Sequence, residues 1–131
     1  MNQEKLVRIA AFLLRIVAGL IFLQNGGLKL FGWFGMMHGQ LPTLMLVAGI
    51  IETVGGALII LGLFTRPAAF ISSGEMAFAY FMGHVSHAGH WYAPLVNQGQ
   101  PAVLLCFVFL FFAAYGGGMW SLDAKLFKHK A

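Results

Sequence analysis

Three ionisable residues, Arg15, Glu52 and Glu75, lie inside long apolar stretches of the sequence. A charge at the centre of a membrane helix costs roughly 2.5 to 3.5 kcal/mol on insertion scales, so these residues should face one another or a wet cavity. Each follows the start of its stretch by eight or nine residues, which places all three near one level of a membrane. The sequence therefore predicts an intramembrane polar core in which Arg15 pairs with Glu52. Glu75 is left over, and we expect it to be protonated because low dielectric disfavours an unpaired carboxylate.

Two interpretations of this predicted core remain open. Gly49, Thr53 and Gly56 share the helical face of Glu52, and small residues on that face allow a neighbouring helix to approach closely. The charges then form either a structural ion pair that fixes the register of the helices or a centre that handles protons or contacts a ligand.

A second polar group is predicted at the outer ends of the first and third helices. Its members are Gln24, Asn25, Lys29, His84 and His87. A quinone head needs donors for its two carbonyl oxygens and an apolar slot for its ring, which Phe22, Phe78 and Phe81 would provide. The competing interpretation is ordinary polar decoration of a membrane surface.

A metal site is not predicted at the third helix. His84, His87 and His90 have a spacing that suits metal binding on one continuous helix, but Gly83 and Gly89 predict a break there. Neither a carboxylate nor a thiol accompanies the histidines. We therefore interpret them as interfacial side chains with wet tips.

The elements that must position these residues are membrane helices. A helix needs about 20 residues to cross roughly 30 Å of hydrocarbon. Hydrophobic residues make up 60% of the 131-residue chain and charged residues only 9%. Glycine and proline divide it into four apolar stretches, at approximately residues 6–24, 44–64, 67–83 and 101–116. The predicted fold is all-α, an integral membrane four-helix bundle that forms a single domain over residues 1–131.

Charge and cysteine content narrow the possible functions. The net charge of +4 comes from basic residues beside or between apolar stretches, where they act as topology signals, so nucleic-acid binding is not expected. The single cysteine, Cys106, cannot make an internal disulfide or perform dithiol exchange. This excludes the four-helix quinone-linked disulfide oxidases, which need paired thiols.

Lysine and arginine also predict the orientation. They occur in the N-terminal tail, at Arg66 between the second and third stretches, and in the C-terminal tail, whereas the two other loops carry only Lys29. The positive-inside rule then places both termini in the cytoplasm of a multi-pass bacterial inner-membrane protein.

Several short segments, taken in order, resemble the DoxX family of small bacterial membrane proteins. They are Leu14-Arg15, Gly19-Leu20-Ile21-Phe22, Lys29-Leu30-Phe31-Gly32, Glu52-x-x-Gly55-Gly56, Gly62-Leu63-Phe64-Thr65-Arg66, Pro94-Leu95-Val96-Asn97, Cys106-Phe107-Val108-Phe109-Leu110 and Trp120-Ser121-Leu122-Asp123. None is specific alone, but the combination covers nearly the whole chain. The chain departs from the family pattern at Gln100, where an acidic residue is expected after the Asn97-x-Gly99 turn.

The resemblance implies a four-helix membrane bundle with redox associations, since relatives include a subunit of an archaeal thiosulfate:quinone oxidoreductase. We therefore expect an accessory or quinone-linked component of membrane redox or thiol-stress metabolism, and not a self-sufficient enzyme. No covalent cofactor is expected, and a redox partner protein would supply any electron carrier. The expected partners are the lipid bilayer, this redox protein and a homo-oligomeric copy. The alternatives are a small proton-coupled transporter and a membrane scaffold for other proteins.

Overall fold

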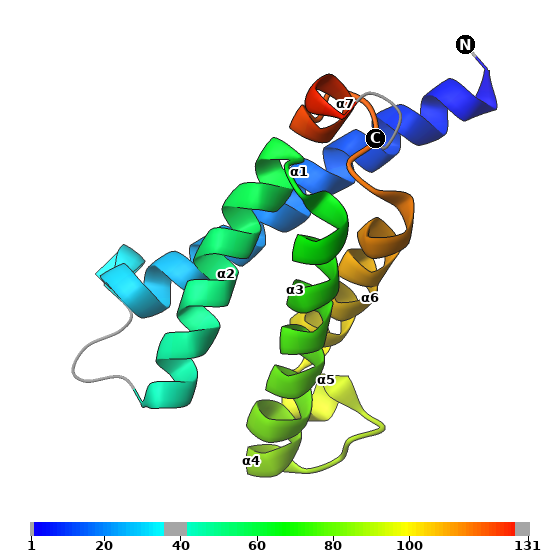
Figure 1. The fold of residues 1–131 in the computed structure, drawn as a ribbon. Coiled ribbons are helices and arrows are strands. Elements are labelled where there is room, and N and C mark those ends of the chain that lie inside the picture. Colours follow the sequence, from blue (N-terminus) through cyan, green and yellow to red (C-terminus); the bar gives the residue numbers. More distant parts are fainter. Residues whose placement is uncertain (1, 36–41, 128–131) are drawn as a thin grey trace.

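The computed structural model describes residues 2–35 and 42–127. Every element in these two ranges is helical, which confirms the all-α prediction (Figure 1). The elements are α1 (Gln3–Phe31), the 3-10 turn η1 (Trp33–Gly35), α2 (Thr43–Leu61), α3 (Thr65–Ala79), the π-helical segment η2 (Tyr80–Val85), α4 (Ser86–Ala88), α5 (Pro94–Asn97), α6 (Gln100–Tyr115) and α7 (Leu122–Leu126).

The long helices pack as two pairs. α1 packs along α2, α3 packs along α6, and the contact between α2 and α3 joins the pairs. The start of α1, the turn between α2 and α3, and α7 lie toward the same end of the molecule (Figure 1). We call this the basic end, because Lys5, Arg8, Arg66 and Lys125 belong to these segments.

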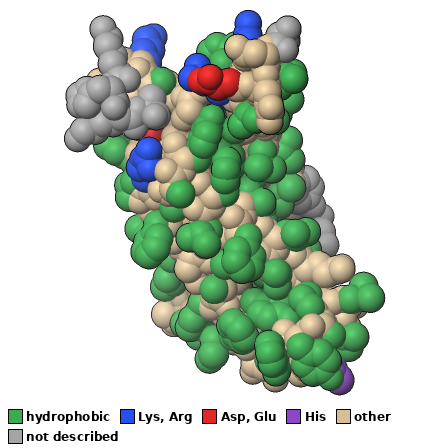
Figure 2. Space-filling view, turned by 90° about the vertical axis from the view of Figure 1, so that its right-hand side faces the viewer, with side chains coloured by type: hydrophobic (Ala, Val, Ile, Leu, Met, Phe, Trp, Pro, Cys, Tyr) green, Lys and Arg blue, Asp and Glu red, His purple; other side chains and the backbone are tan. Residues whose placement is uncertain are grey.

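The interior and the outer surface are both apolar. Phe22, Ile59, Phe109 and Phe112 are completely buried between the helices. Large hydrophobic side chains of all four long helices are nevertheless exposed, among them Val17, Val54, Phe70 and Phe107. Figure 2 shows such side chains covering most of one face, with charged groups gathered toward one end. An apolar surface of this extent is typical of a protein whose solvent is lipid.

Among the described residues, two helices, α1 and α2, are long and apolar enough to cross a membrane, and α6 is a shorter apolar helix. The helical stretch that begins with α3 continues without a break through η2 and α4 to Ala88. Part of the predicted loop between the first two stretches, residues 36–41, lies outside the described residues.

The sequence prediction was wrong at two glycine positions. Gly26-Gly27 does not end the first helix, because α1 continues to Phe31. These glycines instead allow close packing: a Cβ on Gly26 would lie 2.5 Å from the backbone nitrogen of Thr53, and one on Gly27 would overlap the ring of Trp33. Gly83 does not break the third helix either, since the chain remains helical there as part of η2. The helical stretch ends only at Gly89.

Candidate functional site

A buried ion pair joins the first two helices. Lys29 Nζ in the last turn of α1 donates to Glu52 Oε1 on α2 at 2.6 Å. The Glu52 side chain is only 1% exposed, whereas that of Lys29 is 20% exposed. Close packing makes this reach possible, because Gly49, one turn before Glu52, leaves room for Leu30 and the Cβ of Lys29. The lysine therefore enters the interior from the partly open end of α1.

The third helix adds a second carboxyl group to this pair. Glu75 of α3 lies beside Glu52 and close enough to Lys29 to interact with its charge. Its Oε1 is buried and has no hydrogen-bond partner in the part of the chain that the structure describes, and the same is true of Thr53 Oγ1 and Ser72 Oγ. Ser72 lies one turn before Glu75 and faces Gly55 of α2, where a Cβ would come within 2.8 Å of its hydroxyl oxygen. We call Lys29, Glu52 and Glu75, with these two hydroxyl groups, the carboxyl centre.

The charges of the carboxyl centre do not balance. Two ionised carboxylates beside one ammonium group leave one uncompensated negative charge, and Lys29 is the cation that faces Glu75. An uncompensated charge in an apolar interior is strongly disfavoured. One proton shared by the two carboxyl groups removes the imbalance and supplies a donor.

The predicted pair of Arg15 with Glu52 is wrong. Arg15 is 1% exposed, and its guanidinium group donates to the carbonyl oxygens of Gly117 at 2.5 Å and Trp120 at 3.2 Å. It also lies over the ring of Phe12, with Asp123 as the facing acid. Equal depth along separate helices does not decide which side chains meet, and α1 carries Lys29 to Glu52 instead. Arg15 therefore holds the C-terminal segment and does not belong to the carboxyl centre.

Two segments from distant parts of the sequence meet at this C-terminal segment. The carboxylate of Asp123 accepts hydrogen bonds from the backbone N–H groups of Phe64 at 2.8 Å and Thr65 at 2.9 Å, which lie at the start of α3. The N–H of Asp123 in turn donates to the carbonyl of Gly62 at 2.8 Å. Arg66 adds hydrogen bonds to the carbonyls of Ala114 and Tyr115. The segments 62–66 and 120–123, which contributed to the family resemblance, thus form one structural unit.

The outer polar residues have separate neighbours. His84 Nδ1 lies 3.2 Å from the carbonyl oxygen of Asn97, and His87 Nδ1 lies 2.6 Å from that of Gly83. Gln24 is exposed and Asn25 is half-buried. No hydrogen bond or ion pair in the described ranges joins Lys29 to a histidine.

The three phenylalanines of the predicted aromatic slot also have separate environments. Phe22 is buried against Phe109, whereas Phe78 and Phe81 are 51% and 54% exposed. The five residues of the predicted ligand site therefore do not share one set of contacts, and that site stays a prediction. Within residues 2–35 and 42–127, no group of three His, Cys, Asp or Glu side chains is arranged to hold a metal ion.

Asn97 organises the loop that connects α4 to α6, a role that sequence reasoning missed. Its amide group donates to Tyr80 Oη at 3.0 Å and to the carbonyls of Gly89 and His90, and its side-chain oxygen accepts from Gly99 N–H. Tyr80 Oη donates to the carbonyl of Trp91 at 2.5 Å. The Pro94–Asn97 segment of the family resemblance was the available signal, but it did not reveal the partner.

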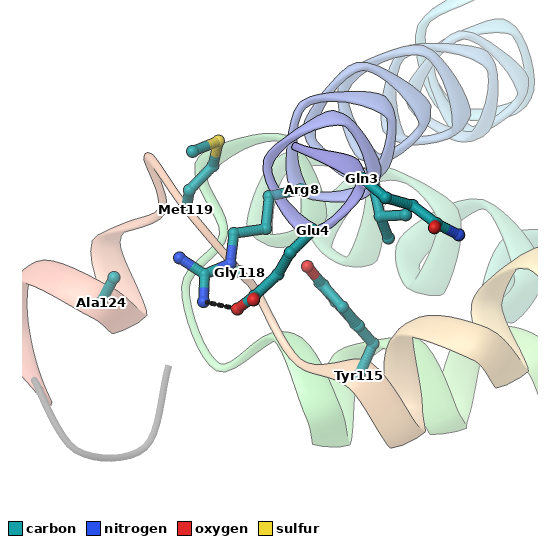
Figure 3. Close-up of a pocket in the computed structure, with 8 residues that line it drawn as sticks. Gln3, Glu4, Arg8, Tyr115, Gly118, Met119 and Ala124 are labelled. Atoms are coloured by element: carbon teal, nitrogen blue, oxygen red, sulfur yellow. Dashed lines mark hydrogen bonds and ion pairs between the residues drawn. The ribbon is translucent and has the colours of Figure 1, made fainter. Parts of the chain in front are cut away.

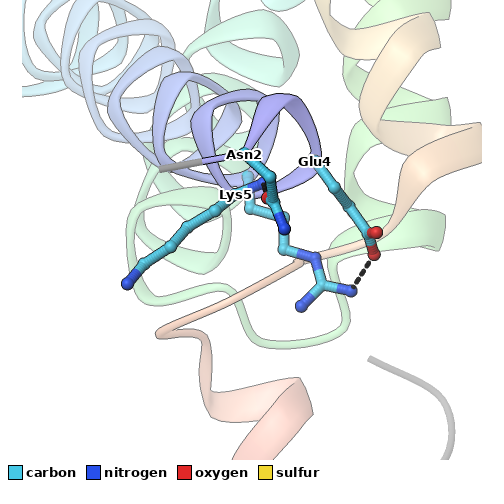
Figure 4. Close-up of polar contacts among 4 residues, drawn as sticks. Asn2, Glu4 and Lys5 are labelled. Carbon is cyan, nitrogen blue, oxygen red and sulfur yellow. Dashed lines mark hydrogen bonds and ion pairs between the residues drawn. The ribbon is translucent and has the colours of Figure 1, made fainter.

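An open pocket of about 920 Å³ lies at the basic end (Figure 3). It is lined by Gln3, Glu4, Val7, Arg8, Tyr115, Gly118, Met119 and Ala124. Glu4 and Arg8 form an exposed ion pair of 2.7 Å at its rim, and the side chain of Asn2 caps α1 by accepting from Lys5 N–H (Figure 4). These contacts satisfy groups at the helix start and leave the carboxyl centre as the best candidate for chemistry.

Comparison with known proteins agrees with the membrane character of the surface. The DoxX family model matches residues 10–85. An uncharacterized protein of Haemophilus influenzae is 44% identical over 131 residues, which cover 97% of this chain and 98% of the relative. An uncharacterized membrane protein of Mycobacterium tuberculosis is 29% identical over 132 residues, which cover 88% of this chain and 80% of the relative. No solved structure matches. The chain belongs to the DoxX family of membrane proteins.

Proposed function

We propose that this protein takes up and releases one proton at its carboxyl centre, as an accessory component of quinone-linked redox metabolism in the membrane. The observation that carries the proposal is the placement of two carboxyl groups beside one lysine in a buried interior. A proton suits this centre better than a divalent metal cation, because one proton neutralises the single excess negative charge, whereas a divalent cation would leave an excess positive charge beside Lys29.

The proposed link to quinones is compatible with the stoichiometry of quinone reduction. Reduction of a quinone to a quinol takes up two electrons and two protons, so a membrane protein that delivers protons complements one that delivers electrons. The redox partner protein would supply the electrons, and the resemblance to redox-associated relatives motivates this assignment.

A proton-coupled transporter is the second candidate. Glu52 has its own cation in Lys29, but Glu75 has none among the described residues, and a carboxyl group without its own cation is the feature that a proton-coupled carrier uses. Binding of a short-chain quinone, followed by quenching of tryptophan fluorescence, separates the two candidates. We expect saturable binding in the wild type. If the wild type binds no quinone, the quinone link is wrong and the transporter or scaffold is favoured.

Infrared spectroscopy of the purified protein tests the proton itself. A protonated carboxyl group has a C=O stretch that a carboxylate lacks, and we expect this band in the wild type near neutral pH. Glu75→Gln should remove the band, because Glu52 then keeps a simple ion pair with Lys29. Glu4→Gln, which changes an exposed carboxyl group at the basic end, should retain it. A wild-type spectrum without a protonated carboxyl at any pH that preserves the fold would refute the proposal.

We further propose that the protein crosses the bacterial inner membrane four times with both termini in the cytoplasm. The gathering of Lys5, Arg8, Arg66 and Lys125 at one end supports this orientation. Reporter fusions after Arg66 and Lys130 should indicate the cytoplasm, and fusions near His38 and Gln98 the periplasm. His38 and Lys130 lie outside the described residues, and the fusions require only their place in the sequence. A C-terminal fusion that reports the periplasm would contradict the four-span arrangement.

A further inference from the structure

A second pocket, of about 600 Å³, opens at the basic end between α1, the end of α2 and α7. One wall is apolar and the other is cationic. The residues that line it are Phe12, Arg15, Ile16, Ile60, Leu61, Trp120, Ser121, Leu122, Ala124 and Lys125. A pocket of this kind, an apolar slot with a few polar groups on one side, suits an amphiphilic ligand.

The polar wall has an excess of positive charge. Arg15 and Lys125 line the pocket, and Asp123 is the acid that faces Arg15. Both oxygens of Asp123 already accept backbone hydrogen bonds at the start of α3. Lys125 is exposed and makes no ion pair within the described ranges. Two cations and one carboxylate leave a net charge of +1, which an anion with a single charge would neutralise.

The buried arginine has unused hydrogen-bonding capacity. Its two terminal nitrogens donate to the carbonyls of Gly117 and Trp120, but Nε is buried and has no acceptor within residues 2–35 and 42–127. Trp120 adopts a positive φ of 55°, a backbone conformation that is uncommon for a residue other than glycine. The ring of Trp120 packs edge-on against Phe12 at 5.0 Å while remaining 65% exposed. Arg15 therefore helps to position an aromatic wall of the pocket as well as its charge.

We propose that this pocket binds an anionic phospholipid, with the phosphate group near Lys125 and Arg15. The start of an acyl chain would lie on Ile16, Ile60 and Leu61. These residues belong to helices whose exposed surface is apolar, so a chain that leaves the pocket continues along a surface that already faces lipid. An exposed tryptophan next to the cationic wall matches the usual place of this residue at the membrane interface. A free phosphate would share the cationic wall but would leave the apolar wall uncovered.

The test uses the full-length protein in detergent and a phosphatidylglycerol with brominated acyl chains, which quench nearby tryptophan. We expect saturable quenching in the wild type and loss of the saturable component in Trp120→Phe, which leaves the two other tryptophans unchanged. Lys125→Ala should raise the half-saturating lipid concentration about five-fold, because one basic residue near an anionic lipid contributes roughly 1 kcal/mol to binding. Lys5→Ala is the matched control, an exposed lysine of the same end that does not line the pocket, and it should leave binding unchanged.

Three results would overturn the proposal. Equal quenching by brominated phosphatidylcholine would show that the anionic headgroup is not recognised. Displacement of the lipid by inorganic phosphate at a similar concentration would show an anion site to which the acyl chain contributes nothing. An equal loss of affinity in Lys5→Ala and Lys125→Ala would show general attraction to a basic surface. None of these results depends on the carboxyl centre, so they leave the proposed proton exchange untouched.

Discussion

Lys29 and Glu52 form a 2.6 Å ion pair between α1 and α2 only because α1 remains helical past Gly26-Gly27. A helix that ended at these glycines would leave Lys29 in a loop. The continuous helix brings the lysine beside the carboxylate, and the missing side chain of Gly26 lets the backbone of α2 approach at Thr53. The continuity of α1 and the close packing at glycine therefore determine that Lys29 is the cation that pairs with the buried Glu52.

The first prediction concerns this ion pair. Lys29→Met or Glu52→Gln alone should destabilise the protein strongly, because removing one partner of a buried pair typically costs about 3 to 5 kcal/mol. The double variant Lys29→Met/Glu52→Gln should be more stable than the sum of the single effects predicts. The measurement is thermal unfolding of the detergent-purified variants, followed by circular dichroism. Strict additivity of the two effects would mean that the side chains do not interact.

The same cycle with Arg15 in place of Lys29 is the control. Arg15 contacts the carbonyls of Gly117 and Trp120, so Arg15→Met should be destabilising by itself. Its effect should add to that of Glu52→Gln, since the two side chains lie in separate networks. Coupling between Arg15 and Glu52 would contradict the structure.

The second prediction compares two helical glycines. Gly26→Ala places a Cβ 2.5 Å from the backbone nitrogen of Thr53, so the helices must move apart, and overpacking of this kind costs about 1 to 3 kcal/mol. The added methyl group of Gly74→Ala on α3 meets none of the described residues within 4 Å and should stabilise the protein by about 0.5 to 1 kcal/mol, because alanine restricts the unfolded chain. Unfolding midpoints of the two variants should therefore shift in opposite directions. A higher unfolding midpoint in both variants would show that α1 and α2 are not in close contact at Gly26.

Much of the fold could be predicted from the sequence because apolar length is a strong signal. The predicted stretches 44–64 and 101–116 correspond to α2 (Thr43–Leu61) and α6 (Gln100–Tyr115) within a few residues. Glycine was the weaker signal, because it marks both chain breaks and close helix contacts. Gly89 and Gly116 end helices as predicted, whereas Gly26 lies inside one, and the sequence does not distinguish the two uses.

The members of the carboxyl centre were individually visible in the sequence, but their partners were not. Glu52 and Glu75 stood out because charges are rare in apolar helices. The sequence predicted Lys29 at the outer surface because this residue lies near the end of the first helix. Whether its side chain reaches the interior depends on tertiary packing. Asp123 was visible only as part of the family resemblance, although its carboxylate binds the start of α3, where Thr65 lies 58 residues away in the sequence.

The last prediction concerns Asp123, whose carboxylate holds the start of α3. Asp123→Ala removes hydrogen bonds to the N–H groups of Phe64 and Thr65 and the acid that faces Arg15. Hydrogen bonds to a charged group contribute roughly 1.5 to 3 kcal/mol each. We therefore expect the free energy of unfolding to fall by about 2 kcal/mol or more. Asp123→Asn, which keeps one acceptor oxygen, should lose less stability.

Glu4→Gln is the matched control, because it removes the acid of an exposed ion pair with Arg8, and such pairs contribute about 0 to 1 kcal/mol. Unfolding midpoints in detergent give the comparison. If Asp123→Ala and Glu4→Gln have equal midpoints, the C-terminal segment does not support α3, and the two motif segments 62–66 and 120–123 are independent of each other.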